Sequence, residues 1–181
     1  MSAPIATPRL LLRELTVADC SAEYLGWLND PEVNRFLETR FAVQDLASVR
    51  DFVARVAASP NELLYGIFLA DGGRHIGNIK IGPIRRDHGV ADVSLLIGAR
   101  DCWGRGYAAE AIAAVSRHAF AALGVAKLSA SMYAANQGSR HAFLKAGYRD
   151  EGLRRAHYAL DGGRCDLHEL GLLPTDLEPA S

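Results

Sequence analysis

The stretch Trp103-Gly104-Arg105-Gly106-Tyr107-Ala108 decides how the rest of this chain is interpreted. It stands between an apolar stretch with strand character, Val90–Gly98, and an Ala-rich stretch with helical periodicity, Tyr107–Leu123. The first turn of a helix leaves main-chain N–H groups without partners, and its positive dipole end attracts anions. Glycines permit positive φ angles and a close approach of ligand to main chain. The stretch therefore predicts a phosphate or diphosphate site held mainly by the main chain, to which Arg105 could add one charge contact.

Two better-known phosphate motifs are excluded by their spacing. The pattern Gly104-x-Gly106-x-x-Ala109 matches the dinucleotide fingerprint, but that motif needs an acidic residue about 20 positions further on to bind a ribose. Residues 111–149 contain no Asp or Glu. The nucleotide P-loop fails as well, because no Gly-x-x-x-x-Gly-Lys-Ser/Thr occurs. A strand-to-helix turn with purely structural glycines is the alternative that this stretch alone leaves open.

The elements on either side predict the fold class. Before the glycine stretch we expect strands and helices in the order Arg9–Glu14, a helix from the capping box Thr16–Asp19 to about Leu28, a short helix at Pro31, a helix from Gln44 or Asp45 to Pro60, then strands Leu63–Ala70, His75–Ile84 and Val90–Gly98. After it we expect the helix Tyr107–Leu123, the strand Lys127–Tyr133, the helix Ser139–Ala146, and a hairpin of Ala156–Leu160 with Cys165–Leu173. This order predicts a mixed α/β fold in one domain, 1–181, with a central, mostly antiparallel, twisted sheet, helices on both faces and a frayed tail at 177–181.

The composition of the 181 residues excludes several classes of protein. With a net charge of −1 at pH 7 and only short basic pairs, at Arg85–Arg86 and Arg154–Arg155, we expect neither nucleic acid nor an anionic membrane as a partner. The three widely spaced cysteines, Cys20, Cys102 and Cys165, fit neither a disulfide framework nor a zinc motif, and we expect no metal site. We see no signal-peptide pattern and no apolar run long enough to span a bilayer, so we expect a cytoplasmic protein.

A second motif follows one strand later, where Asn136 and Ser139 precede Lys145-Ala-Gly147-Tyr148. Together the two segments resemble the GNAT superfamily of N-acetyltransferases, and in particular the branch that contains the ribosomal-protein alanine N-acetyltransferases. The family's cofactor signature, Gln/Arg-x-x-Gly-x-Gly/Ala, falls on Trp103–Ala108, with Trp in the first position as is common in that branch. Arg9–Arg13 and Trp27–Val33 fit the branch as well. The resemblance covers nearly the whole chain and implies a GNAT-like fold.

The resemblance also implies which residues bind the co-substrate acetyl-CoA, without a metal. These are Leu96, Ile97, Gly98, Trp103, Gly104, Arg105, Gly106, Tyr107, Ala108, Asn136, Ser139, Phe143 and Lys145. A main-chain donor from Leu96–Gly98 is expected to stabilise the oxyanion of the reaction. Trp27, Asn29 and Glu32 are the expected acceptor contacts, and the Asp161–Gly163 turn is expected to border the same cleft.

Two residues are candidates for the acid–base chemistry. An α-amino group, with a pKa of roughly 8, must lose its proton before it attacks. Alignment to the family places Asp92 near the usual acidic base, and an exposed aspartate at a strand edge is the alternative. Ser139 is carried over as a possible proton donor to the sulfur, and a helix cap is its alternative. Tyr133 and Tyr148 could donate instead, although packing with a bonded hydroxyl would explain both.

The function so implied is direct transfer of an acetyl group from acetyl-CoA to a primary amine, either a protein N-terminus or a small amine. An amino sugar, free or linked to a nucleotide, is an alternative acceptor. A CoA-binding regulatory module without turnover is the alternative of a different class. Members of the family are monomers or dimers, so a monomer and a homodimer both stay open.

Overall fold

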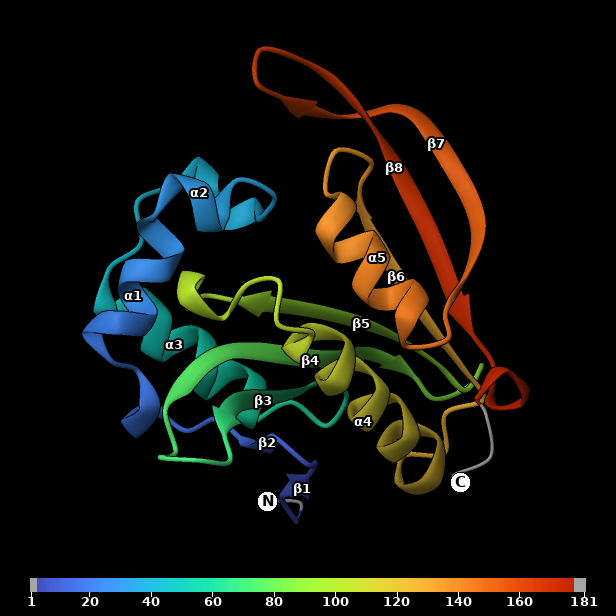
Figure 1. Cartoon of the computed structure of the whole chain (residues 1–181), viewed down its shortest axis with the longest axis horizontal. Helices are drawn as coiled ribbons and strands as arrows, with labels where there is room; N and C mark the ends of the chain where they lie inside the picture. Colours follow the sequence, from blue (N-terminus) through green and yellow to red (C-terminus); the bar gives the residue numbers. More distant parts are fainter. Residues whose placement is uncertain (1–2, 178–181) are drawn as a thin grey trace.

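The computed structural model describes residues 3–177, which form the following elements in chain order. They are β1 (Ile5–Ala6), β2 (Leu10–Glu14), η1 (Val17–Asp19), α1 (Ala22–Asn29), α2 (Pro31–Asn34), η2 (Glu38–Phe41), α3 (Leu46–Ala57), β3 (Leu63–Leu69), β4 (His75–Arg85), β5 (Val90–Ile97), η3 (Arg100–Cys102), α4 (Tyr107–Ala122), β6 (Lys127–Tyr133), α5 (Gln137–Lys145), β7 (Arg149–Leu160), β8 (Gly163–Leu172) and η4 (Pro174–Asp176). The predicted mixed α/β fold with a central sheet is confirmed (Figure 1).

The described strands make one eight-stranded sheet with the order β1-β2-β3-β4-β5-β6-β8-β7. The first five strands follow chain order and pair antiparallel, as short turns between sequential hairpins require. The pair β5–β6 is parallel, because α4 returns the chain to the end of the sheet at which β5 begins. The sheet is therefore mostly antiparallel, as predicted, and its one parallel pair joins the two strands on either side of α4 in the chain.

Helices α3 and α4 cover opposite faces of this sheet. The ring of Tyr65 on β3 meets that of His118 on α4, with 6.1 Å between ring centroids. The preceding residue, Leu64, lines a pocket together with Val49 of α3. Successive side chains of a strand point to opposite faces, so the two helices lie on different sides, as Figure 1 also shows. The buried apolar residues of the sheet and of these helices form a common core.

Helix boundaries follow local signals, with one correction. Asp45 caps α3, and Asp30 caps α2 with Pro31 in the first position, as predicted. The capping box at Thr16–Asp19 opens only the short η1, and the predicted continuous helix to Leu28 is wrong. The carboxylate of Asp19 is held by Arg13 of β2 as well as by Thr16, which ends this turn, and α1 begins with Ser21 as a new cap.

The C-terminal hairpin is longer than predicted. Its first strand, β7, begins at Arg149 and not at Ala156, and its register shifts between Arg154 and Tyr158, where Ala156 has φ +49°. A bulge of this kind interrupts the alternation from which a strand is recognised. The short β1 was not predicted. Of the predicted tail, Leu177 packs against the core, and 178–181 lie outside the described residues.

Candidate functional site

The glycine stretch presents a row of main-chain donors at the start of α4. Gly104 and Gly106 have φ +72° and +80°, which favour glycine, and Gly106 is the N-cap of α4. Within the described residues, the first N–H of this turn to find an acceptor is that of Glu110, which donates to the Gly106 carbonyl at 3.2 Å. The N–H groups of residues 104–109 have no hydrogen-bond partner in this part of the chain. An anion is the natural ligand of such a turn.

Two contacts fix this loop to the sheet. The indole N–H of Trp103 donates to the Ile97 carbonyl at the end of β5, at 2.8 Å. Arg9, beside β2, donates through Nε to a Glu110 carboxylate oxygen at 2.7 Å and through a terminal nitrogen to the Arg105 carbonyl at 2.9 Å. The donors are therefore held in place before any ligand arrives, which reduces the entropy lost on binding.

Glu110 is a second part of this clamp. Its carboxylate also accepts from the Thr7 hydroxyl at 2.7 Å and from the Arg9 main-chain N–H at 3.0 Å. Although burial opposes the effect, these hydrogen bonds lower the pKa of Glu110 below its ordinary value. Sequence reasoning missed the clamp, because no local pattern connects Arg9 with Glu110, although Arg9 stands in the motif quoted for the branch.

Strands β5 and β6 separate next to the loop. They pair in parallel only as far as Asp92 opposite Ser129. Both then continue, to Ile97 and to Tyr133, without a further mutual pair among the described residues, while β6 stays paired with β8 as far as Tyr133 and the two strands diverge (Figure 1). The end of β5 therefore has no strand partner on its β6 side in the described residues, and this gap in the pairing is called the opening between β5 and β6.

Two hydrogen bonds show which main-chain groups of β5 face this opening. The Gly89 carbonyl accepts from the Lys127 N–H at 3.1 Å on the β6 side, and the Gly98 N–H donates to the Ile76 carbonyl at 2.9 Å on the β4 side. Main-chain groups of alternate residues point to the same side of a strand. Hence Ile97, like Leu95, directs its N–H toward β6, whereas Gly98 has already used its own.

The predicted CoA residues of α5 lie along the other side of the opening. The Asn136 side chain caps α5 by accepting from the Ser139 N–H at 3.2 Å, so both residues hold the first turn of this helix. Phe143 is buried against Tyr148, and Lys145 is exposed in the last turn. The Tyr148 hydroxyl bonds with that of Ser116 at 3.1 Å, and burial raises the pKa of Tyr148 well above its usual range.

Tyr133, the other tyrosine considered as a proton donor, has a bonded hydroxyl as well. It donates to Glu38 at 2.7 Å and accepts from Arg40 at 2.9 Å, which ties η2 to the end of β6. For both tyrosines the structure shows the packed, bonded hydroxyl that the alternative interpretation described.

Asp92 lies at the beginning of β5 and pairs with Arg85 of β4 at 3.0 Å, with 38% of its side chain exposed. It has the same parity along the strand as Ser94 and Leu96, which line a pocket on the α3 side. Ser94 lies about 7 Å and Leu96 about 13 Å along the strand from Asp92, so Asp92 is near one end of this pocket but outside direct contact with a group beside Leu96. Its carboxylate faces the side of the sheet opposite α4.

The predicted acceptor contacts have structural partners. Trp27 is 7% exposed, and a Cβ placed on Gly98 would lie 2.0 Å from its ring, so Trp27 supports the end of β5 from beneath. Asn29 bonds with the main chain of Gln44 at 2.9 Å. Glu32 forms an ion pair with Arg100 of η3, which links α2 to the segment before the glycine stretch. None of the three lines either of the two pockets described next.

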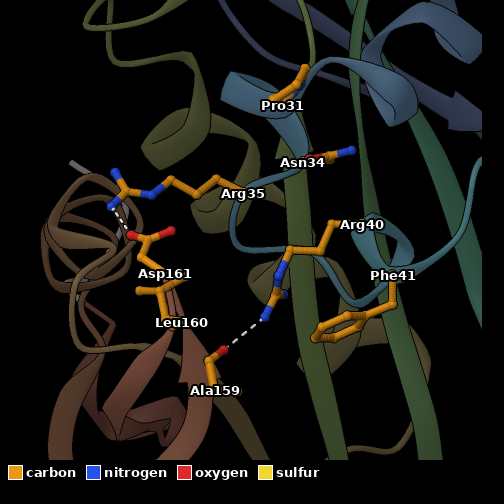
Figure 2. Close-up of a pocket in the computed structure, with 9 residues that line it drawn as sticks. Pro31, Asn34, Arg35, Arg40, Phe41, Ala159, Leu160 and Asp161 are labelled. Carbon is orange, nitrogen blue, oxygen red and sulfur yellow. Dashed lines mark hydrogen bonds and ion pairs between the residues drawn. The ribbon is translucent and has the colours of Figure 1, made fainter.

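Two of the pockets in the described structure border α1 and α2, the helices that carry the predicted acceptor contacts. The larger, of about 330 Å³, separates α2 and η2 from the tip of the β7–β8 hairpin. Figure 2 shows that Arg35 and Arg40 reach across it, to Asp161 at 2.6 Å and to the Ala159 carbonyl at 3.0 Å. The other, of about 240 Å³, has β5 itself as one wall.

Neither a metal centre nor a membrane-spanning helix is found in residues 3–177. No group of three or more His, Cys, Asp or Glu in this range could hold a metal ion. None of its helices combines the length and apolarity needed to cross a bilayer. Cys102, next to the glycine stretch, is buried, and burial followed by the charge of Asp101 raises the pKa of its thiol. A thiol of this kind is a poor nucleophile.

Comparison with known proteins identifies the family of this chain. Residues 9–149 match the model of the acetyltransferase (GNAT) domain. A relative described as the uncharacterized N-acetyltransferase YoaA of Bacillus subtilis is 29% identical over 166 residues, which are 91% of this chain and 93% of the relative.

Solved structures of similar fold include two that contain coenzyme A. One is the spermidine N-acetyltransferase of Vibrio cholerae with CoA and spermine, at a TM-score of 0.83 and 18% identity, covering 94% of this chain and 98% of that one. The other is RimL, a ribosomal L7/L12 α-N-protein acetyltransferase with CoA, at a TM-score of 0.83 and 17% identity with the same coverage. At these identities the likeness concerns the fold. With the family match over most of its length, the chain belongs to the GNAT family and is an acetyl-CoA-dependent N-acetyltransferase.

Proposed function

We propose that the N–H groups of residues 104–109 bind the diphosphate of acetyl-CoA and that the pantetheine arm runs through the opening between β5 and β6. The observation that carries this proposal is the row of donors without partners at the start of α4, held by Arg9 and Trp103. Charge-assisted hydrogen bonds contribute roughly 1.5–3 kcal/mol each, against roughly 0.3–1 kcal/mol for the helix dipole. Main-chain geometry therefore supplies most of the affinity, with Arg105 and Lys145 adding charge.

The reaction we propose is direct attack on the thioester. The neutral amine nitrogen bonds to the acetyl carbon and gives up a proton toward the base, the carbon–sulfur bond breaks, and the departing thiolate takes a proton. Charge develops on the acetyl oxygen in the transition state, and a main-chain donor aimed at it is an effective stabiliser. Within the predicted group Leu96–Gly98 we assign this donor to Ile97, because the Gly98 N–H is bonded to Ile76. Ser139, in the first turn of α5, is the proposed proton donor to sulfur.

We propose Asp92 as the base, acting through water. Its carboxylate lies on the pocket side of β5, about 13 Å along the strand from Leu96, so a chain of several water molecules would carry the proton to it. Because this carboxylate is out of reach of the amine, a relay through water suits it better than direct proton transfer. Trp27, which we had expected to contact the acceptor, is assigned to support of Gly98.

The acceptor is the part of the function that the family leaves open. The neighbours named above act on spermidine and on a ribosomal protein N-terminus, and an amino sugar is a further class. We propose a small amine or a protein N-terminus as the acceptor, a reducing cytoplasmic location, and a monomer or homodimer as the working form.

Release of the CoA thiol, followed with a thiol reagent across a panel of amines, tests this function. We expect acceptor-dependent release above the rate of acetyl-CoA hydrolysis, with acetylated product detected by mass spectrometry. Tight binding of CoA without release for any acceptor would favour the regulatory module over the enzyme.

A further inference from the structure

The pocket of about 240 Å³ lies next to the proposed site of acetyl transfer at the end of β5. Leu95 and Leu96 of β5 line it, and the next residue along the chain is Ile97, whose N–H we assign to the oxyanion. Consecutive Cα atoms are about 3.8 Å apart, so a group two or three bonds from the attacking nitrogen would reach this pocket. The larger pocket has no lining residue from β5 and lies at the hairpin tip.

The walls of the smaller pocket present more apolar than polar surface. Tyr24 and Leu28 of α1, Val49 and Phe52 of α3, and Leu64 of β3 surround it. Among the polar side chains on the wall, Gln44 donates to the Thr39 and Ala42 carbonyls, and the Ser48 hydroxyl donates to the Asp45 carbonyl. The Asn78 amide oxygen bonds with the His75 ring at 2.8 Å, whereas the Ser94 hydroxyl has no hydrogen-bond partner among the described residues. The volume is below the roughly 300–1,000 Å³ of sites for drug-sized ligands, so the occupant is about the size of one large side chain.

The charges argue against a polycation. Among the residues that line this pocket the charged one is Lys80, whose ammonium bonds with Glu62 at 2.9 Å. The larger pocket carries Arg35 and Arg40, and its Asp161 is already paired with Arg35. A polyamine would bring further positive charges to walls that offer it no unpaired carboxylate among these lining residues, and charge repulsion disfavours it.

We propose that the acceptor of this enzyme is a primary amine carrying one apolar group, the size of a leucine or phenylalanine side chain, which occupies the pocket between α1, α3 and β5. This inference rests on the proposed acetyl transfer and adds the chemical class of the acceptor. The same chemistry occurs in a free arylalkylamine or branched alkylamine and in a peptide that begins with Leu or Phe.

The experiment measures thiol release with phenylethylamine, 3-methylbutylamine, a tripeptide beginning with Phe, a tripeptide beginning with Ser, spermidine and glucosamine. We expect kcat/KM for the apolar amines to exceed that for spermidine, the serine peptide and glucosamine by at least ~10-fold. Comparing the free amines with the Phe tripeptide shows which source the enzyme prefers. Higher turnover with spermidine or glucosamine than with the apolar amines would overturn the inference and leave acetyl transfer standing, whereas no release with any acceptor would overturn both.

A matched pair of variants locates the subsite. Phe52 and Phe41 are both exposed at the surface, and they line the smaller and the larger pocket respectively. Phe52→Ala should raise KM for phenylethylamine by roughly 10-fold, the scale of one lost apolar contact, with kcat little changed. Phe41→Ala should leave both unchanged. The reverse result would place the acceptor in the hairpin pocket and contradict the assignment.

Discussion

Replacing Gly106 by valine tests the role of the main chain at the start of α4. The φ of +80° at this N-cap is a conformation that costs a residue with a side chain about 1–3 kcal/mol. Steric overlap contributes little, since the nearest atom to an added Cβ is a terminal nitrogen of Arg9 at 3.5 Å. The variant can relieve the strain by rotating the neighbouring peptides, which turns their N–H groups away from the ligand.

The expected loss of affinity follows from the number of donors that move. Loss of two charge-assisted hydrogen bonds of roughly 1.5–3 kcal/mol each gives about 3–6 kcal/mol. Because 1.4 kcal/mol corresponds to a factor of ten, the Kd for CoA should rise by at least ~100-fold. Calorimetric titration with CoA measures it directly.

Gly124 provides the matched control at the other end of α4. It has φ +67°, and an added Cβ would meet nothing within 4 Å. Gly124→Val should therefore lower stability by a similar ~1–3 kcal/mol, or about 2–4 °C in Tm for each kcal/mol, without changing the Kd for CoA. If the two variants lost stability alike and Gly106→Val still bound CoA within a few-fold of wild type, the main-chain account would be refuted.

Three further substitutions test the remaining assignments. Glu110→Gln should destabilise the protein at pH 7, because Thr7 and Arg9 hold the pKa of this carboxyl low despite its burial. The difference in unfolding free energy between wild type and variant should disappear as the pH falls through the folded-state pKa. Urea unfolding between about pH 3 and pH 7 measures this difference, and an increase of the difference in acid would contradict the assignment. Asp92→Asn should lower kcat/KM by roughly 10²–10⁴ with CoA affinity retained, and a loss of less than a few-fold in thiol-release assays would remove Asp92 from the relay. Ser139→Ala should lower kcat by about 10²-fold while KM for acetyl-CoA changes far less; equal changes in both would make Ser139 a binding residue only.

Local features of the fold could be predicted from the sequence because their causes are local. Gly104 and Gly106 have the positive φ angles that the tight turn before α4 requires. Gly124 likewise has a positive φ at the end of α4. The caps at Asp30 and Asp45 use side chains adjacent in sequence to the N–H groups they bond. Hydrophobic periodicity and the residue types found in turns and caps were sufficient to predict these elements.

Features that depend on distant partners could not be predicted. The clamp joins Arg9 to Glu110 across 101 positions, and no periodicity marks it. The pairing of β5 with β6 stops after Asp92 although β6 stays paired with β8 as far as Tyr133, and nothing in the sequence of either strand marks this position. For the same reason, the packing of the Trp27 ring against Gly98 could not be predicted from the residues around either position.

The central claim concerns the amide protons at the start of α4, and a two-dimensional ¹H–¹⁵N spectrum of the protein titrated with CoA observes them individually. The account predicts that the resonances of Gly106, Tyr107 and Ala108 shift strongly downfield as binding saturates, while those of Gly124 and its neighbours at the far end of the helix stay in place. Saturable CoA binding that left the three resonances unmoved would contradict it.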